Sequence, residues 1–187
     1  MENNFNVIIS GVGGQGLITL VKIITEAALI NGNDVKSSEL HGLSQRGGSV
    51  LIHVRFGKKI NSPLVQQGKA DLIMGLELLE SLRVLNFSSK ETDVLVNNYL
   101  WPIPGGSPRE EINKKLQDSL GKKLYLVSAS DICKEKFGKE VLSGIYLLSY
   151  AVNQKLIPLK RESVLQAIKN VIPQKYQELN IKTLELA

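Results

Sequence analysis

Apolar runs of two different lengths open the chain. Residues 5–10 form a short β-branched run that stops at a cluster of glycines, and residues 17–30 then carry apolar positions over the length of a helix. An Asn-Gly turn follows at residues 31–34, and residues 35–40 form a second short extended run. This pattern predicts a strand, a tight glycine loop, a helix and a second strand.

A strand pattern then appears where simple alternation would place a helix. Residues 48–56 alternate apolar and polar side chains, which is typical of a strand with one buried face. Residues 57–60, "GKKI", read as a turn toward another extended piece at residues 60–65. The sequence therefore predicts a β excursion after the second strand.

The alternation of strands and helices returns after this excursion. Strands are predicted at 70–77, 92–98 and 123–129, and helices at 78–85 and 109–120. From Asp131 onward the chain carries helical periodicity, and Pro158 and Pro173 divide it into separate helices because proline is poorly tolerated inside one. These elements predict an α/β fold that is Rossmann-like, with a mainly parallel sheet, the β excursion and a helical C-terminus.

Length and composition add limits to this picture. A chain of 187 residues, 43% of them hydrophobic, suits a single domain over residues 1–187 with its own core. Its one cysteine, Cys133, excludes an internal disulfide and cannot by itself hold a zinc ion or an iron–sulfur cluster. The net charge of +5 comes from scattered lysines, which indicates solvated helix faces and no nucleic-acid surface.

The sequence shows no targeting or membrane pattern. Its N-terminus lacks the basic and then apolar design of a signal peptide, and no apolar run approaches the roughly 20 residues of a membrane span. We therefore expect a soluble cytoplasmic protein with no membrane contact.

The glycine loop "GVGGQG" lies between the first strand and the first helix. Its G-x-G-x-x-G spacing lets backbone N–H groups approach an anion near a helix N-terminus. The loop comprises Gly11, Gly13, Gly14, Gln15 and Gly16. A dinucleotide would also need a carboxylate about 20 residues further on, a position that Glu39 could fill. Another phosphate-bearing or acidic ligand, or close strand–helix packing alone, would explain the loop equally well.

A second polar stretch, "ELHGLSQRGGSV" at residues 39–50, follows the second strand. Ligands bind at the carboxyl ends of strands in open α/β sheets, so this stretch and the glycine loop are expected to face one crevice. Its candidate residues are His41, Ser44, Gln45, Arg46, Gly47 and Gly48. The guanidinium of Arg46 suits a carboxylate or a phosphate. The alternative is that Gln45 and Arg46 attach the β excursion to the core or to another subunit.

Together these two motifs identify a resemblance to a known family. "GVGGQG" followed by "SELHGLSQRGGSV" closely resembles the gamma-type domain of the 2-oxoacid:ferredoxin oxidoreductases. The resemblance extends through "ADLIMGLELLESLR" to "KEVLSGIYLLSYAV", and thus over most of the chain. Within the family, the chain is most similar to the small, beta subunits of indolepyruvate ferredoxin oxidoreductases. Other members act on pyruvate, 2-oxoglutarate or branched-chain 2-oxoacids.

The resemblance implies a reaction and a division of labour. Enzymes of this family oxidatively decarboxylate a 2-oxoacid with coenzyme A, giving an acyl-CoA, carbon dioxide and reduced ferredoxin. Thiamine diphosphate and iron–sulfur clusters supply that chemistry. The resemblance places both on a larger catalytic partner subunit, so this chain is expected to bind no cofactor alone and to be inactive alone. Its glycine loop and residues 41–48 are expected to face that partner or the path of coenzyme A.

Two other functions remain open on the sequence alone. One is a free-standing NAD-linked oxidoreductase that uses the glycine loop and Glu39, and the other is a non-catalytic nucleotide-binding scaffold. His53 is expected either in the core or facing a partner, and Cys133 is expected to be an incidental thiol. Trp101, on the proline-rich loop at residues 101–108, is expected either to anchor an interface or to pack on its own core.

Overall fold

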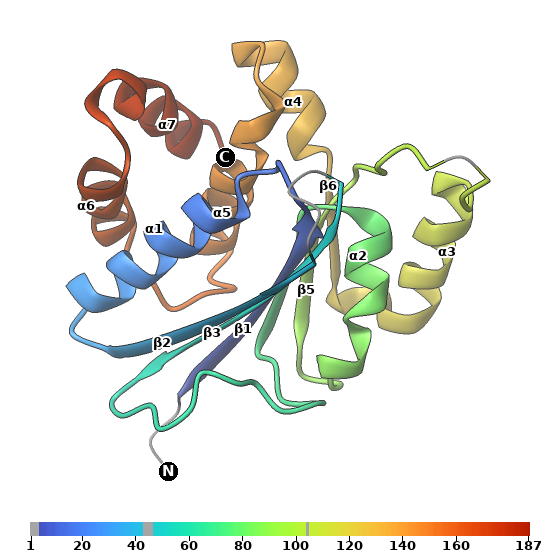
Figure 1. Cartoon of the computed structure of the whole chain (residues 1–187), viewed down its shortest axis with the longest axis horizontal. Helices are drawn as coiled ribbons and strands as arrows, with labels where there is room; N and C mark the ends of the chain where they lie inside the picture. The colour runs from blue at the N-terminus through green and yellow to red at the C-terminus, as the bar shows by residue number, and fades with distance from the viewer. Residues whose placement is uncertain (1–3, 43–46, 104) are drawn as a thin grey trace.

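A six-stranded sheet lies at the centre of the protein, with helices on both faces (Figure 1). The computed structural model describes residues 4–42, 47–103 and 105–187. The strands are β1 (Phe5–Val12), β2 (Asp34–His41), β3 (Ser49–Gly57), β4 (Leu72–Gly75), β5 (Asp93–Asn97) and β6 (Leu124–Val127). Their order across the sheet is β2-β3-β1-β4-β5-β6. The pairs β1-β4, β4-β5 and β5-β6 are parallel. β3 is antiparallel to both of its neighbours, β1 and β2.

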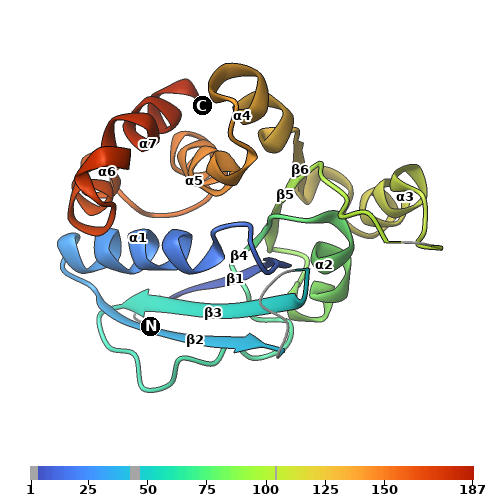
Figure 2. The same cartoon turned by 45° about the horizontal axis from the view of Figure 1, so that its top comes forward.

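Two apolar cores hold the helices against this sheet. The helices are α1 (Leu17–Ile30), α2 (Leu78–Arg83), α3 (Arg109–Leu120), α4 (Ala129–Phe137), α5 (Ser143–Asn153), α6 (Arg161–Val171) and α7 (Gln174–Leu186). α1, α5, α6 and α7 cover one face, as Figure 2 shows, and share a large core with β1 and β3. α2 and α3 cover the other face over a smaller core that includes Ile8, Ile73 and Val94.

The expected α/β, Rossmann-like architecture is confirmed. The β excursion is β3, and it lies within one residue of the predicted range 48–56. The C-terminal part is helical, with Pro158 between α5 and α6 and Pro173 between α6 and α7, as predicted. The predicted helix at 78–85 ends earlier, at Arg83, and a short 3-10 turn, η1 (Leu85–Phe87), follows it.

One predicted extended piece, at residues 60–65, forms no strand. Its backbone donors bond to side chains and have no neighbouring strand as partner. The N–H of Ile60 donates to Asp34 Oδ2 at 2.7 Å, and the N–H of Val65 donates to His53 Nδ1 at 3.1 Å. The two side chains accept the N–H groups that a neighbouring strand would otherwise accept, so this segment needs no further strand pairing. His53 is buried, as expected, and its ring meets the edge of Phe87.

The position of β3 separates the first two parallel strands. In the register, Gly11 of β1 pairs with Val50 of β3, and Val50 pairs in turn with His41 of β2. Val50, Ile52 and the other alternate residues of β3 bury their side chains in the core under α1. β2 therefore forms the edge of the sheet, and most of its residues are exposed.

Alanine at Gly75 should destabilise the fold. A Cβ atom there would lie 2.8 Å from the Cβ of Ser81 and would collide with its hydroxyl oxygen, which donates to the backbone oxygen of Glu77. We expect Gly75→Ala to lower the free energy of unfolding by about 1–3 kcal/mol, the usual cost of overpacking, in urea unfolding followed by circular dichroism. Gly42→Ala is the matched control, since a Cβ there meets nothing within 4 Å. Equal stability of the two variants would contradict this packing.

The buried His53 should make stability depend on pH. Burial lowers the pKa of His53 below its ordinary value of 6.5, so the unfolded chain takes up this proton at a higher pH than the folded chain does. The stability that His53 contributes is therefore complete above pH 6.5 and falls as the pH drops from there toward the lowered pKa. We expect the melting temperature to fall less in His53→Asn than in the wild type when the pH is lowered from about 7.5 to about 5.5. His41→Asn, on the exposed edge strand, should follow the wild type. A wild-type slope retained in His53→Asn would refute this assignment.

Candidate functional site

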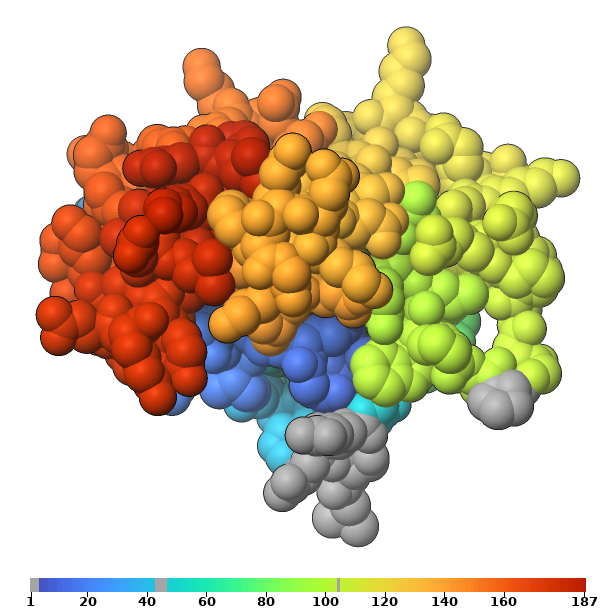
Figure 3. Space-filling view, turned by 90° about the horizontal axis from the view of Figure 1, so that it is seen from above, coloured from blue at the N-terminus to red at the C-terminus, as the bar shows by residue number. Residues whose placement is uncertain are grey.

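A polar crevice of about 380 Å³ lies beyond the carboxyl ends of β1, β5 and β6. Its walls are the glycine loop, the segment after β5, the start of α4, and the 3-10 turn η3 (Glu140–Leu142) that leads into α5. Figure 3 views this side of the molecule and shows the segment of α4 beside the start of α1. The lining residues are Gly13, Gly14, Gln15, Tyr99, Trp101, Ser130, Glu140, Val141 and Ser143. Ligands of open α/β sheets bind in this kind of position.

The glycine loop is held by its own glutamine. The N–H of Val12 donates to Gln15 Oε1 at 2.9 Å, and Gln15 Nε2 donates to the backbone oxygen of Leu76 at 3.0 Å. A Cβ at Gly11 would lie 2.7 Å from that Gln15 oxygen, so the close approach requires glycine there. Gly16 caps α1 in the left-handed conformation with no side-chain hydrogen bond to the cap. The first N–H groups of α1 thus lack a side-chain cap, and a helix start of this kind favours an anion.

The described end of the second motif meets the glycine loop directly. The N–H of Gly13 donates to the Gly48 oxygen at 2.8 Å, and the N–H of Gly47 donates to the Gly13 oxygen at 3.1 Å. Gly47 has a φ of 70°, and a Cβ on it would lie 3.5 Å from Nε1 of the Trp101 ring. The structure therefore brings Gly13, Gly47, Gly48 and Trp101 together. Ser44, Gln45 and Arg46 lie outside the described residues.

Glu39 and His41 are not brought to this crevice. Both lie on the exposed edge strand β2, and neither lines the cavity. Glu39 pairs with Ile52 of β3, whose other neighbour is Ile9 of β1. Two strand spacings of about 4.8 Å therefore separate Glu39 from β1. A ribose carboxylate of the dinucleotide type would instead lie on the strand next to β1.

Two buried acids behind the crevice were missed by the sequence analysis. Glu77, only 1% exposed, accepts the N–H of Glu80 at 2.7 Å through one oxygen and the N–H of Trp101 at 3.0 Å through the other. Glu80 in turn accepts from the hydroxyl of Ser49 and pairs with Arg83. Burial raises the pKa of Glu77 above its usual value, and the two backbone N–H groups lower it in part. The spacing of two glutamates, three apart at a helix start, resembles a capping box and was the available signal.

Paired amide and hydroxyl groups position the opposite wall. Asn97 Nδ2 donates to Ser130 Oγ at 2.7 Å, and the N–H of Ser130 donates to Asn97 Oδ1 at 3.1 Å. These bonds fix the start of α4 against β5.

Tyr99 also lines the crevice. Burial, and next the charge of Glu140, raises the pKa of Tyr99, so its phenol stays protonated at neutral pH. The wall offers hydrogen-bond donors that are neutral at physiological pH.

The described residues show no metal-binding cluster. Across residues 4–42, 47–103 and 105–187, no three His, Cys, Asp or Glu side chains lie together as metal ligands would. Cys133 is buried, and burial raises the pKa of its thiol to about 11, which keeps it un-ionised and unreactive. Within those same ranges, no helix is long and apolar enough to span a membrane.

Removing the charge of Glu77 should loosen the wall that carries Trp101. Glutamine offers one acceptor oxygen for two backbone N–H donors, so one donor is left facing the amide nitrogen. We expect Glu77→Gln to lower the free energy of unfolding by about 1–3 kcal/mol. Trp101 is the only tryptophan, so its fluorescence should shift to the red as the loop opens.

The exposed Glu135→Gln is the matched control and should leave both readouts unchanged. An unchanged Trp101 emission in Glu77→Gln would show that this carboxylate does not hold the loop.

Comparison with known proteins identifies the family. The family described as "Pyruvate ferredoxin/flavodoxin oxidoreductase" matches residues 6–187. The indolepyruvate oxidoreductase subunit IorB of Thermococcus kodakarensis is 32% identical over 97% of this chain and 93% of its own length. The common gamma subunit of the pyruvate/ketoisovalerate oxidoreductases of Pyrococcus abyssi is 32% identical over 92% of this chain and 89% of its own length.

A solved structure shows the same fold. The pyruvate oxidoreductase subunit PORC of Thermotoga maritima superposes with a TM-score of 0.71, covering 98% of this chain and 94% of that one, at 19% identity. Its sheet and helical layers therefore match those described above. From the family match and the near-complete coverage at 32% identity, this chain belongs to the pyruvate ferredoxin/flavodoxin oxidoreductase family.

Proposed function

We propose that this chain is the small subunit of a 2-oxoacid:ferredoxin oxidoreductase that acts on indolepyruvate or another arylpyruvate. The observation that carries this proposal is the similarity to an indolepyruvate oxidoreductase subunit over 97% of the chain. The similarity to the pyruvate/ketoisovalerate gamma subunit covers less of the chain, 92%. The complex would oxidatively decarboxylate the 2-oxoacid with coenzyme A, releasing an acyl-CoA, carbon dioxide and two electrons for ferredoxin.

The cofactors of this reaction belong on the larger partner subunit. The residues of this chain do not fit an iron–sulfur cluster, because the sequence has one cysteine and that thiol is buried. The glycine loop is also engaged by Gln15 and Gly48, which leaves little of it to hold a diphosphate in the manner of a cofactor site. We therefore assign thiamine diphosphate and the clusters to the catalytic partner, in the cytoplasm, and expect this chain to be inactive alone.

The role proposed for this chain is to complete the entrance to the partner's active site. Gly13, Gly47 and Trp101 form a fixed surface at the carboxyl end of the sheet, and the uncapped start of α1 adds donors beside it. Donors of this kind suit the phosphates of coenzyme A as they pass toward the partner. Ser44, Gln45 and Arg46 directly precede Gly47 in the sequence and lie outside the described residues, and we propose that they take part in the same contact with the partner or the ligand.

The alternative of a free-standing NAD-linked oxidoreductase loses its main support. It required Glu39 beside the glycine loop, and β3 lies between them. A non-catalytic scaffold would bind a phosphate ligand through the same crevice, and no specific contact favours it over the subunit.

The proposal is tested by anaerobic affinity purification of the chain from its own source. We expect a larger, brown partner to be recovered, and the complex to reduce a viologen dye only with coenzyme A present. Indolepyruvate and phenylpyruvate should give rates at least about tenfold above those with pyruvate, 2-oxoglutarate and 3-methyl-2-oxobutanoate, which corresponds to about 1.4 kcal/mol of discrimination. The isolated chain is the control and should show no reduction.

Two results would contradict different parts of this proposal. A preference for pyruvate or 2-oxoglutarate would exclude the arylpyruvate assignment and leave the subunit role intact. Recovery of the chain alone, without colour or dye reduction, would exclude the subunit role.

A further inference from the structure

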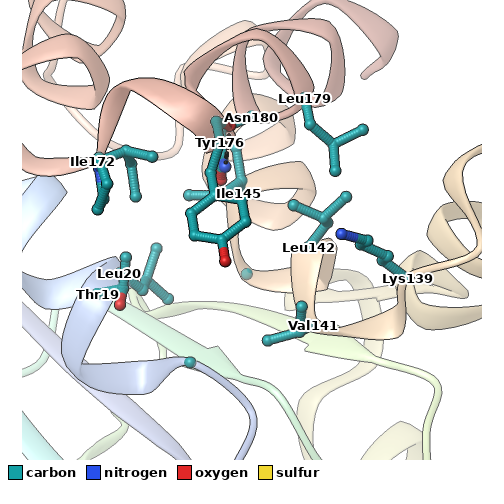
Figure 4. Close-up of a pocket in the computed structure, with 13 residues that line it drawn as sticks. Thr19, Leu20, Lys139, Val141, Leu142, Ile145, Ile172, Tyr176, Leu179 and Asn180 are labelled. Atoms are coloured by element: carbon teal, nitrogen blue, oxygen red, sulfur yellow. Dashed lines mark hydrogen bonds between the residues drawn. The ribbon is translucent and has the colours of Figure 1, made fainter.

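A second cavity, the apolar pocket (Figure 4), shares the side chain of Val141 with the polar crevice. It measures about 480 Å³ and is enclosed by α1, α5, α7 and the turn that precedes α5. Apolar side chains form its walls, chiefly Leu20, Leu142, Ile145, Ile172 and Leu179. Its volume falls within the range of about 300–1,000 Å³ that small-molecule sites occupy.

Contacts between helices hold the frame of the apolar pocket. The backbone oxygen of Leu184, near the end of α7, accepts from the buried hydroxyl of Ser149 on α5. A Cβ on Gly144 of α5 would lie 3.4 Å from Leu20 Cδ2 of α1, so these two helices pack closely. α5 is therefore fixed against both α7 and α1, which border the pocket.

Two lysines approach the same ring at the rim of the pocket. Tyr176 projects from α7 toward α1 and Val141, and its side chain is 45% exposed. Lys175 Nζ lies 4.8 Å from the centre of its ring, and Lys139 Nζ lies 5.9 Å from it. Both amino groups thus lie within cation–π distance of one ring.

No acid balances these two charges among the ion pairs of the described residues. The neighbouring Glu140 pairs with Lys134 at 2.8 Å and not with Lys139. No ion pair within residues 4–42, 47–103 and 105–187 includes Lys139 or Lys175. The pocket therefore combines apolar walls with an unbalanced positive rim, and an anion at this rim would be attracted by both amino groups.

We propose that the apolar pocket binds a small carboxylate with an apolar tail. The tail lies against Leu20, Ile145 and Leu179, where it is removed from water. The carboxylate lies at the rim, near the amino group of Lys139, which lines the pocket, and that of Lys175, which lies beside the Tyr176 ring. A neutral apolar molecule would gain only the first contact, and a cation would be repelled by the rim. The proposal rests on this pocket alone and does not depend on the reaction assigned to the family.

The test is a titration of the full-length chain, labelled at its Ile, Leu and Val methyl groups, by two-dimensional NMR. The probes are indole-3-acetate and 4-methylpentanoate, with indole-3-acetamide as the neutral counterpart of the first. We expect saturable shifts confined to the pocket methyls, including those of Leu20, Ile145 and Leu179. The dissociation constant of the amide should be at least about tenfold larger than that of the acid.

Variants separate the charge of the rim from the space of the pocket. The double variant Lys139→Gln/Lys175→Gln should weaken acid binding about tenfold and bring it close to that of the amide. Lys114→Gln/Lys160→Gln, two exposed lysines outside the pocket, is the matched control and should bind as the wild type does. Thr19→Trp, at the exposed lip of α1, should fill the entrance and abolish the shifts while the remaining methyl spectrum is retained.

Several outcomes would overturn the proposal. Equal affinity for acid and amide would reduce the site to a non-selective apolar cavity. Absence of saturation up to about 5 mM acid would leave no specific binding. Undiminished binding to Thr19→Trp would place the probe elsewhere. Exclusion of the acid from the purified complex, with binding retained by the isolated chain, would make the pocket a subunit contact and not a small-molecule site.

Discussion

The arrangement at the carboxyl end of the sheet depends on two hydrogen bonds between Gly13 and the Gly47–Gly48 pair. They extend the antiparallel pairing of β1 with β3 by one step, past the Val12–Ser49 pair and into the glycine loop. The N–H and C=O of Gly13 are consumed in this step, so the loop cannot direct that N–H at a phosphate. Next to this step, Gly47 turns the chain with a φ of 70° and lies close to the Trp101 ring. One short ladder therefore fixes the glycine loop, the end of the second motif and the aromatic wall together.

Buried acids stabilise this arrangement from behind, at some cost. Glu77 and Glu80 are both nearly excluded from water, and burial of a carboxylate is unfavourable unless hydrogen bonds compensate it. Their bonds hold two separate segments, since Glu80 accepts from Ser49 at the start of β3 and Glu77 accepts from the backbone of Trp101. Two apolar side chains at these positions would avoid the cost of burying carboxylates. Ser49 and the backbone of Trp101 would then lose these hydrogen bonds. Such a local cost is typical of places where position matters more than stability.

The sequence predicted the elements well and their neighbours less well. Periodicity is a local property, so it located α1, α3 and the β3 excursion, and the prolines located the breaks between the last helices. The order of strands is not local. Nothing in residues 48–56 indicates that this strand lies between β1 and β2, and that placement is why Glu39 is distant from the glycine loop. The extended piece at 60–65 failed for a related reason, because the distant side chains of Asp34 and His53 satisfy its backbone. At the site, the glycines were identified by their spacing, whereas Glu77 was hidden in a stretch that reads as an apolar strand running into a helix.

Insertion of β3 also changes what a Rossmann-like sheet can do. In a dinucleotide fold, the strand beside β1 supplies the ribose carboxylate, and the glycine loop gives its N–H groups to the diphosphate. Here β3 lies beside β1 in the place of that strand and runs antiparallel to it. Glycine and serine, Gly48 and Ser49, lie where β3 begins, and the oxygen of Gly48 accepts the N–H of Gly13, which is one of the donors of the glycine loop. What remains exposed is an uncapped helix start, a protonated phenol, an indole and the carboxylate of Glu140, which can hold or guide a ligand. The domain thus lacks a ribose carboxylate beside the glycine loop and has one loop donor fewer for a diphosphate, which agrees with the subunit role proposed for it.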